Sequence, residues 1–422
     1  MTIKKPKIIK DPLLGIIDIT EVIPLIDTKA FQSLGFKNQL GFASAIFPAA
    51  THTRKQHCLG AYERTKRLME MWKKYGFVNE KEAKNLPIYA LYHDVGHGPF
   101  SHVTEGLGSV DHNERGMSLF ENLKDVFEKS GFDYHFIHDM FSRKNSLYLG
   151  VSDKNLGMEK LDYLERDAYY TIGERPGMEF LTHHIYFINN KIVIDQSAVD
   201  AAKDVQDFYI KMYKHVYTRK KAAIIQRLIE KMTHILMKDG LDESTLFDLT
   251  DYGLFGKFES SNNKILKSHY NNFMMGDFPK LALEFVYEDI EISLDEIKTI
   301  KRKGIEPKFF DKLVVSNKFK DVDFLEKLEN EIGEIAEVPG NNIFLIPASK
   351  RRFEPDDLNV YTQEGSIKKI SNIYPNHFKA MKEYGRSHMS FRIAVHEDYR
   401  RKIFNKSEEI KKYIIDLASN IL

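Results

Sequence analysis

One short stretch of the sequence joins an apolar run to a dense set of histidines and glycines, and it limits the fold more than any other. It reads Leu91-Tyr92-His93-Asp94-Val95-Gly96-His97-Gly98-Pro99-Phe100-Ser101-His102. The apolar residues 86–92 predict a buried helix, and the glycines and proline that follow predict that it ends near His93-Asp94. An imidazole nitrogen and a carboxylate oxygen at one helix end suit a divalent cation that activates water. We therefore expect a hydrolytic metal site at the end of a core helix.

The composition is that of an ordinary globular protein. Of 422 residues, 42% are hydrophobic and 29% charged, which is enough for a large core and suggests two lobes. Lys and Arg number 62 against 61 Asp and Glu, so no global positive field would recruit nucleic acid. The single cysteine, Cys58, excludes an intramolecular disulfide and a Cys-rich zinc site. Because neither a run of about 18 apolar residues nor a signal-peptide core is found, we expect a cytoplasmic protein without membrane contact.

Hydrophobic periodicity predicts a mainly α protein. Helices are expected at residues 56–74, 86–92, 111–129, 132–141, 157–167, 195–238 with an interruption near Thr218, onward to about 282, and at 322–336. A hairpin is expected within 187–194, turning at Asn189-Asn190, and strands are expected at 290–292, 343–346, 358–361 and 391–395. This order predicts a helical catalytic domain at 1–285 and a smaller C-terminal α/β (α+β) lobe at 286–422, for assembly or regulation.

Acids and bases elsewhere in the chain could complete the site. The helix at 157–167 is dense in acids and could supply further metal ligands, or it could be a solvated charged face. His57 alone would more often be structural. His97, His102 and His112 could cap helices and orient ligands, or they could carry out acid–base chemistry near neutral pH. Four basic residues could neutralise phosphate oxygens, although each alone would ordinarily be a surface charge: Arg54, Lys160, Arg166 and Arg219.

Three segments together resemble the HD-domain superfamily. They are Arg54-Lys55-Gln56-His57, the stretch from His93 to His102, and Asp162-Tyr163-Leu164-Glu165-Arg166-Asp167. Within the superfamily they are similar to the deoxynucleoside triphosphate triphosphohydrolases, the branch that includes dGTPase-like enzymes. The resemblance runs from about residue 11 to residue 238, and the stretch from His93 to His102 is its most specific part. It implies a helical HD-domain phosphohydrolase core.

The resemblance also implies roles for individual residues. His57, His93 and Asp94 match three metal ligands, and Glu159 stands where the family has an aspartate as the fourth. Its extra methylene moves the carboxylate by roughly 1.5 Å, and Asp162 is the alternative ligand. The family's catalytic cluster matches His102, Glu105 and His112, with Glu105 in place of an aspartate. Its substrate contacts, on the phosphates, sugar and base, match Gln39, Leu40, Arg54, Lys160, Tyr163, Asp167 and Arg219.

These residues predict a metal-dependent enzyme that hydrolyses dNTPs to deoxynucleoside and inorganic triphosphate. The expected metal is iron, manganese or magnesium, with zinc or nickel as alternatives, and the expected assembly is a homodimer or homotetramer. One alternative is an HD-type phosphodiesterase or nuclease acting on a cyclic nucleotide or single-stranded nucleic acid. The basic clusters Lys301-Arg302-Lys303 and Lys350-Arg351-Arg352 would serve it. Another is a nucleotide-sensing protein with weak turnover, which the substitution at Glu159 keeps open. No Gly-Lys phosphate loop or dinucleotide fingerprint supports an ATPase or a dehydrogenase.

Overall fold

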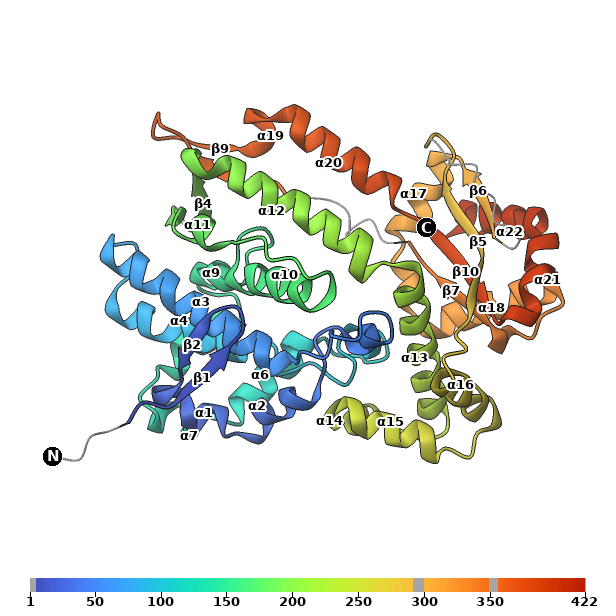
Figure 1. Cartoon of the computed structure of the whole chain (residues 1–422), viewed down its shortest axis with the longest axis horizontal. Helices are drawn as coiled ribbons and strands as arrows, with labels where there is room; N and C mark the ends of the chain where they lie inside the picture. The colour runs from blue at the N-terminus through green and yellow to red at the C-terminus, as the bar shows by residue number, and fades with distance from the viewer. Residues whose placement is uncertain (1–4, 291–299, 349–355, 422) are drawn as a thin grey trace.

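The computed structural model describes residues 5–290, 300–348 and 356–421, and helices dominate it (Figure 1). Its first part forms β1 (Ile8–Asp11), β2 (Gly15–Asp18), α1 (Ile23–Ile26), α2 (Lys29–Ser33), α3 (Arg54–Lys74), α4 (Glu80–Tyr92), α5 (His102–Glu105), α6 (His112–Glu121), α7 (Lys124–Lys129), α8 (Tyr134–Phe141), α9 (Leu149–Ser152) and α10 (Met158–Thr171). The expectation of a mainly α protein with a helical core is confirmed. The helix expected over 111–129 is broken into α6 and α7 at Leu123, and the one expected over 157–167 runs on to Thr171.

Helices α3, α4 and α10 form the frame that carries the site. α3 begins with a capping box, in which the Thr53 side chain accepts from the Gln56 amide while the Gln56 side chain accepts from the Thr53 amide. α4 begins with the same device at Asn79 and Glu82. The second half of α4 is fully buried, as residues 86–92 predict, so its C-terminal end is fixed inside the helical core.

Gly60 allows α3 and α10 to approach each other closely. A Cβ atom at this position would lie 2.6 Å from the Asp162 Cγ atom and still closer to that carboxylate and to the Arg166 guanidinium. No side chain other than hydrogen fits there without displacing the Asp162 carboxylate and the Arg166 guanidinium.

The middle of the chain forms α11 (Glu179–Thr182), β3 (Ile185–Ile188), β4 (Lys191–Asp195), α12 (Val199–Met212), a π-helical turn (Tyr213–Tyr217) and α13 (Lys220–Lys238). The predicted hairpin is confirmed, since Asn189 and Asn190 both adopt positive φ (50° and 58°) between its strands. The predicted interruption near Thr218 is also confirmed, because the Thr218 amide bonds to the Tyr213 carbonyl at 2.9 Å and ends the π turn.

The remaining elements are α14 (Glu243–Asp248), α15 (Asp251–Ser260), α16 (Lys264–Met274), β5 (Lys280–Tyr287), β6 (Lys301–Ile305), α17 (Pro307–Val315), α18 (Val322–Ala336), β7 (Ile343–Ile346), β8 (Asn359–Tyr361), β9 (Ile367–Lys369), α19 (Ile370–Ile373), α20 (Pro375–Ser387), β10 (Phe391–Val395), α21 (Arg400–Asn405) and α22 (Ser407–Asn420). Strands β6, β5, β10 and β7 form one sheet in that order, with α17, α18, α21 and α22 around it (Figure 1). The predicted helix at 322–336 and the predicted strands at 343–346 and 391–395 are confirmed, and the strand predicted at 358–361 begins one residue later.

The prediction that helices continue to about 282 is wrong, because β5 begins at Lys280. Every residue from 281 to 287 is buried, and residues of β5 contribute to two different hydrophobic clusters. A fully buried strand has no alternation, so periodicity alone does not separate it from a buried helix. Of the strand predicted at 290–292, Ile290 follows a turn after β5 and the other residues lie outside the described ones.

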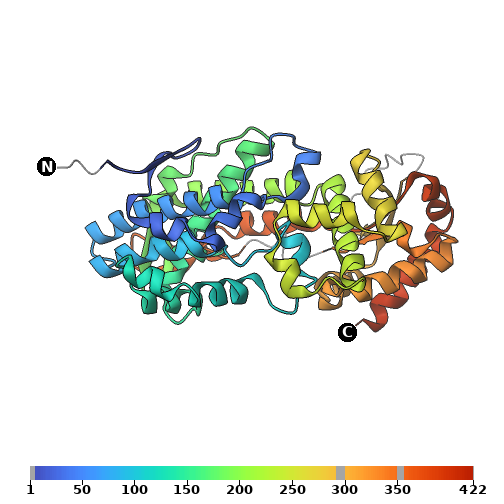
Figure 2. The same ribbon diagram turned by 90° about the horizontal axis from the view of Figure 1, so that it is seen from below.

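The expected boundary near residue 285 falls within β5, and later residues return to the first half of the chain. β8 pairs with β4 in a sheet of order β3-β4-β8-β9, and Leu358, Val360 and Ile370 belong to the main helical core. α20 runs beside α12 in both views (Figures 1 and 2), with Lys203 of α12 over the Tyr374 ring. The division at 285 stays a prediction. Among the described residues, none of the helices combines the length and apolarity that a bilayer crossing requires.

Candidate active site and metal centre

Helices α3 and α4 bring together three of the residues expected to bind metal. His57 lies in the first turn of α3, while His93 and Asp94 follow the last turn of α4. All three are buried, and the atoms they could offer to a cation lie within 4.8 Å of one another. The arrangement therefore offers two nitrogens and one oxygen to a single point, as the sequence predicts.

The hydrogen bonds of the two imidazoles fix which nitrogen faces that point. His57 Nδ1 donates to Asp162 Oδ2 at 2.9 Å, and His93 Nδ1 donates to the Ala90 carbonyl at 2.7 Å. Each Nε2 is then left with a lone pair, and the two Nε2 atoms face each other at 3.2 Å. Two lone pairs at this separation repel, and a cation between them removes the repulsion. The donor set therefore fits a divalent metal.

Without a cation, a proton on one of the two imidazole rings also removes the repulsion between the Nε2 lone pairs. Burial alone would lower the pKa of His57, but the hydrogen bond and charge of Asp162 outweigh it and raise that pKa. A metal would displace this proton, because only the neutral imidazole has a lone pair to offer.

Asp94 is held as an anion by the positive groups around it. Burial alone would raise its pKa, but the neighbouring His93 and Arg54 and the hydrogen bond from His97 hold the pKa of this carboxyl well below its usual range. Arg54 Nη1 donates to Asp94 Oδ2, and His97 Nε2 lies 3.3 Å from Oδ1. The carboxylate is thus ionised and oriented before any ligand arrives.

The two acidic candidates of α10 lie on different sides of the imidazoles. Glu159 Oε2 is 3.8 Å from His93 Nε2 and accepts a hydrogen bond from Ser152 Oγ at 2.8 Å. Its side chain is 31% exposed, so it borders the three buried ligand candidates and could complete the set. Asp162 instead contacts the outer nitrogen of His57, which makes it a residue that orients a ligand.

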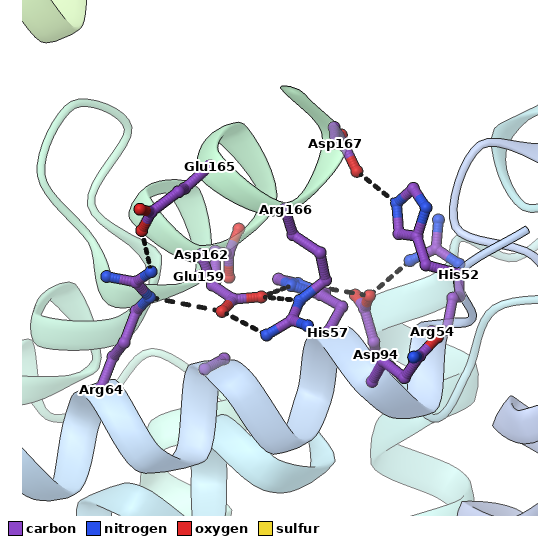
Figure 3. Close-up of polar contacts among 12 residues, drawn as sticks. His52, Arg54, His57, Arg64, Asp94, Glu159, Asp162, Glu165, Arg166 and Asp167 are labelled. Atoms are coloured by element: carbon purple, nitrogen blue, oxygen red, sulfur yellow. Dashed lines mark hydrogen bonds and ion pairs between the residues drawn. The ribbon is translucent and has the colours of Figure 1, made fainter. Parts of the chain in front are cut away.

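A buried network of ion pairs keeps Asp162 in place (Figure 3). Arg166 Nε donates to Asp162 Oδ2 at 2.9 Å, and Arg166 Nη1 donates to Asp11 Oδ2 at 2.7 Å. Arg64 of α3 also reaches Asp162, at 3.3 Å, and pairs with Glu165. Arg166 has no exposed surface, so the sequence-based view of it as a surface charge is wrong.

The expected acid–base residues form a second group next to the metal candidates. Glu105 accepts from His112 Nδ1 through one oxygen and from His102 Nδ1, at 2.8 Å, through the other. Burial alone would lower the pKa of His112, but Glu105 raises it, and the two histidines in turn lower the pKa of Glu105. The raised pKa favours the protonated form of His112. The His102 side chain is 70% exposed.

His97 connects the two groups, a role that the sequence did not assign to it. Its ring stacks on that of His112 with centroids 4.0 Å apart, while its Nε2 lies against Asp94. Burial, followed by the charge of Arg54, lowers the pKa of His97 well below its usual value, so the ring is neutral. The sequence named His97 only together with His102 and His112, as a residue that could cap a helix, orient a ligand or take part in acid–base chemistry.

Of the expected substrate contacts, Tyr163 lies beside the centre and Asp167 lies four residues further along α10. The Tyr163 ring is 6.3 Å from the His57 ring. Asp167 accepts from His52 Nε2 at 2.8 Å and from the Tyr217 hydroxyl at 2.6 Å, one bond to each oxygen. His52 and Tyr217 carry no motif, and only the fold places them against this carboxylate.

The other expected contacts have their own partners. Arg54 is occupied by Asp94 and by Ser101 Oγ, at 2.6 Å. Lys160 Nζ donates to the Lys154 carbonyl at 2.5 Å and lies 3.7 Å from the centre of the Tyr209 ring. Burial lowers the pKa of Lys160 to about 8.

The remaining three expected substrate contacts are Gln39, Leu40 and Arg219. The Gln39 amide bonds to the His52 carbonyl at 3.0 Å, and the buried Gln39 Oε1 has no hydrogen-bond partner among the described residues. Leu40 packs against the main core. Arg219 is exposed, with its guanidinium 5.4 Å from the centre of the Phe47 ring. Contacts of these residues with a substrate stay predictions.

Comparison with known proteins agrees with this geometry. Residues 54–153 match the family model of the HD domain, and the matched range includes His57, His93, Asp94, His102, Glu105 and His112. An uncharacterized protein of Bacillus subtilis is 30% identical over 246 residues, which are 54% of this chain and 56% of that protein. The chain thus matches little more than half the length of this relative.

Two further relatives carry a named activity. The deoxynucleoside triphosphate triphosphohydrolase SAMHD1 homolog of Dictyostelium discoideum is 26% identical over 336 residues, covering 70% of this chain and 62% of the relative. The human deoxynucleoside triphosphate triphosphohydrolase SAMHD1 is 30% identical over 207 residues, covering 39% of this chain and 33% of its own.

Solved structures share the fold over nearly the whole chain. A phosphohydrolase from Bacteroides thetaiotaomicron superposes with a TM-score of 0.70 at 19% identity, covering 93% of this chain and 100% of that one. A hypothetical protein from Aquifex aeolicus superposes with a TM-score of 0.69 at 21% identity, covering 96% and 100%. Since the superpositions cover 93% and 96% of this chain, the shared fold extends beyond residue 285.

Proposed function

We propose that the HD domain at residues 54–153, together with α10, hydrolyses deoxynucleoside triphosphates to deoxynucleoside and inorganic triphosphate. The observation that carries the proposal is the pairing of two groups. His57, His93 and Asp94 present lone pairs to one point. His112, hydrogen-bonded to Glu105, lies next to this group, because its ring stacks on that of His97. The named activity of the SAMHD1 relatives supports the choice of substrate.

The protein's part in metal binding is to present ligands that are already in position. His57 and His93 would bind through Nε2, Asp94 through a carboxylate oxygen, and Glu159 could close the set. A bound iron, manganese or magnesium ion supplies Lewis acidity, which polarises a phosphoryl oxygen and makes water more acidic. Asp162 and the Ala90 carbonyl hold the two imidazoles in the required tautomer, so little reorganisation accompanies binding.

The acid–base group accounts for the protons of the reaction. The oxygen of water bonds to the α-phosphorus, and the bond from phosphorus to the nucleoside 5′-oxygen breaks. His112 donates its proton to that leaving oxygen, since Glu105 raises its pKa. The exposed His102, bonded to the other oxygen of Glu105, takes the proton that water loses. The triphosphate leaves intact.

Selection of a deoxyribose would come from tight packing against the sugar. Asp167 is fixed from two sides by His52 and Tyr217, so it offers a rigid acceptor beside Tyr163. With Leu40 on the other side of the sugar, this wall would leave no room for a 2′-hydroxyl. Arg54, Lys160 and Arg219 would hold phosphate oxygens once substrate displaces their present partners.

The decisive experiment is a product analysis. The purified protein is incubated with each dNTP and each NTP in the presence of manganese, and the products are separated by ion-exchange chromatography. We expect triphosphate and deoxynucleoside from at least one dNTP, and their loss in His93→Ala but not in His183→Ala, which changes an exposed histidine. Release of monophosphate and pyrophosphate, or no product, would contradict the proposal.

The nuclease alternative draws its support from two basic clusters. Lys301-Arg302-Lys303 lies in β6, where Arg302 pairs with Glu284 at 3.0 Å and Lys303 with Glu408 at 2.5 Å. The cluster at 350–352 lies outside the described residues. Since Arg302 and Lys303 already pair with carboxylates, the first cluster does not favour the nuclease over the triphosphohydrolase.

The sensing alternative depends on Glu159. A protein that binds nucleotide but scarcely turns it over should gain activity when Glu159→Asp restores the shorter side chain of the family. Comparison of the steady-state turnover of the variant with that of the unchanged chain separates the sensor from the triphosphohydrolase. A high rate in the unchanged chain, with no gain in the variant, would exclude the sensor.

A further inference from the structure

The segment that leads into α5 has an unusual backbone. Phe100 and Ser101 both adopt positive φ, 54° and 57°, in the left-handed region that residues other than glycine rarely occupy. Such a conformation persists only where the surroundings impose it. Because this segment carries His102 and Glu105, whatever imposes its conformation also determines where the acid–base residues lie.

Asp251, the first residue of α15, makes the contacts that hold this segment. Its Oδ1 accepts from the Phe100 amide and its Oδ2 from the Asn38 amide, each at 2.7 Å. The side chain is buried, with 3% of the residue exposed. Ser101 Oγ adds a second link between the same two segments, since it donates to the Asn38 carbonyl at 3.1 Å.

Asp251 therefore joins two segments that are 62 residues apart in the chain, Asn38 and Phe100 being its two partners. One carries the acid–base residues, and the other continues directly into Gln39 and Leu40, expected at the base and sugar. Both backbone amides need an acceptor, and a single carboxylate supplies one oxygen to each. No apolar residue of similar size could replace it without leaving both amides unpaired.

The charge environment suits an ionised carboxylate at neutral pH. Burial raises the pKa of Asp251 to about 6, while the two amide donors and the charges of Lys37 and Arg54 act in the opposite direction. Lys37 itself donates to the His97 carbonyl at 2.5 Å, so the same segment is tied to the stretch between His93 and His102.

The helix before α15 holds the other end of the same segment. Phe247 of α14 packs on Gly98 and Gly108, where a Cβ atom at either position would overlap its ring. Glu243 accepts from the Ser109 amide at 2.8 Å. Glu243, Phe247 and Asp251 follow one another at intervals of four residues, so α14 and α15 contact residues 98–109 at three successive points.

We propose that Asp251 is a positioning residue, which fixes α5 and the segment at residues 38–40 relative to each other through the Phe100 and Asn38 amides. This inference rests on the proposed function, in which His102 of α5 takes the proton that water loses and Leu40 lies against the sugar. Asp251 itself contacts none of the candidate metal ligands, so its loss misplaces the reacting groups and leaves metal binding intact. A misplacement of about 1 Å can lower turnover by about 100-fold.

The test compares Asp251→Ala and Asp251→Asn with Thr250→Ala. Thr250 is the N-cap of α15 and accepts from the Gly253 amide, so its loss weakens the same helix without removing an acceptor from either segment. We expect kcat on the preferred dNTP to fall about tenfold or more in Asp251→Ala. Asp251→Asn, which keeps one acceptor oxygen, should fall less. The metal content should equal that of the unchanged chain, and kcat in Thr250→Ala should stay within about twofold.

Hydrogen exchange supplies a readout that does not depend on the substrate. In Asp251→Ala, amides in peptides covering 36–41 and 98–110 should exchange faster, while those of α3 should keep their rates. If the unchanged chain releases no triphosphate, the proposed function fails and the exchange result still tests the positioning role. Unchanged exchange in both peptides, unchanged kcat, or an equal loss of kcat in Thr250→Ala would overturn the inference.

Discussion

Two nitrogen atoms, His57 Nε2 and His93 Nε2, face each other 3.2 Å apart because their outer nitrogens are committed elsewhere. At the scale of single residues, this commitment decides which groups bind a cation and which only orient the ligands. Asp162 and Glu159 are three positions apart on α10, so the sequence offers both as ligands. Only the folded chain shows that Asp162 meets Nδ1, whereas Glu159 lies on the Nε2 side.

Removal of the orienting carboxylate should weaken metal binding. In Asp162→Asn the His57 ring loses its anionic acceptor, and we expect the metal affinity to fall about 10- to 100-fold. Competition with a chelator measures this change. Asp11→Asn is the matched control, because Asp11 contacts the same Arg166 but not His57. An equal effect in both variants would assign the loss to Arg166.

The pH dependence of turnover should reveal the link between Glu105 and His112. Because Glu105 raises the pKa of His112, the acid form persists to higher pH, and the rate falls as the pH rises through that pKa. Glu105→Gln removes the negative charge and should move this alkaline limb to lower pH. Glu114 is exposed and lies on α6, the helix that carries His112, and Glu114→Gln should leave the pH profile unchanged. An alkaline limb that does not move in Glu105→Gln would exclude His112 as the acid.

At the scale of elements, the site depends on how closely α3 and α10 approach. The sequence predicted both helices and the buried end of α4, since hydrophobic periodicity is a local signal. It did not predict β5, whose residues are buried on both faces, nor did it indicate that Gly60 marks the contact between α3 and α10. Such contacts depend on pairs of segments and leave no pattern in either one.

Glycine-to-alanine substitutions test that contact. Gly60→Ala should destabilise the fold by about 1–3 kcal/mol through overpacking, despite the better helix propensity of alanine. Gly256→Ala, in α15, has nothing within 4 Å of the new Cβ and should stabilise by up to about 1 kcal/mol. Urea unfolding measures both free energies. A stabilising Gly60→Ala would mean that α3 and α10 do not approach as closely as described.

At the scale of the whole molecule, the chain does not run through one lobe and then the other. Residues after 356 pair with β4 and pack along α12 before β10 enters the second sheet. Of the strands after residue 285, the sequence identified β7, β8 and β10 but not β6 or β9. It did not identify which strands pair, because pairing between segments over 150 residues apart, such as β4 and β8, has no local signal.

A fragment of residues 1–285 tests how far the two parts depend on each other. It lacks Leu358, Val360 and Ile370, each worth about 1.5–3 kcal/mol of buried apolar surface, and it leaves β5 without β10. We expect the fragment to unfold at a lower temperature than the full chain or to be insoluble. Cooperative unfolding at the temperature of the full chain would instead support an independent domain at 1–285.

The position of β10 also has a consequence for synthesis on the ribosome. It lies between β5 and β7, yet it is made more than 100 residues after β5 and about 45 after β7. Until residue 395 has left the ribosome, both of these buried strands present an unpaired, apolar edge. Completion of this sheet is therefore a late step, and a chain whose translation stops before β10 is exposed to edge-to-edge aggregation.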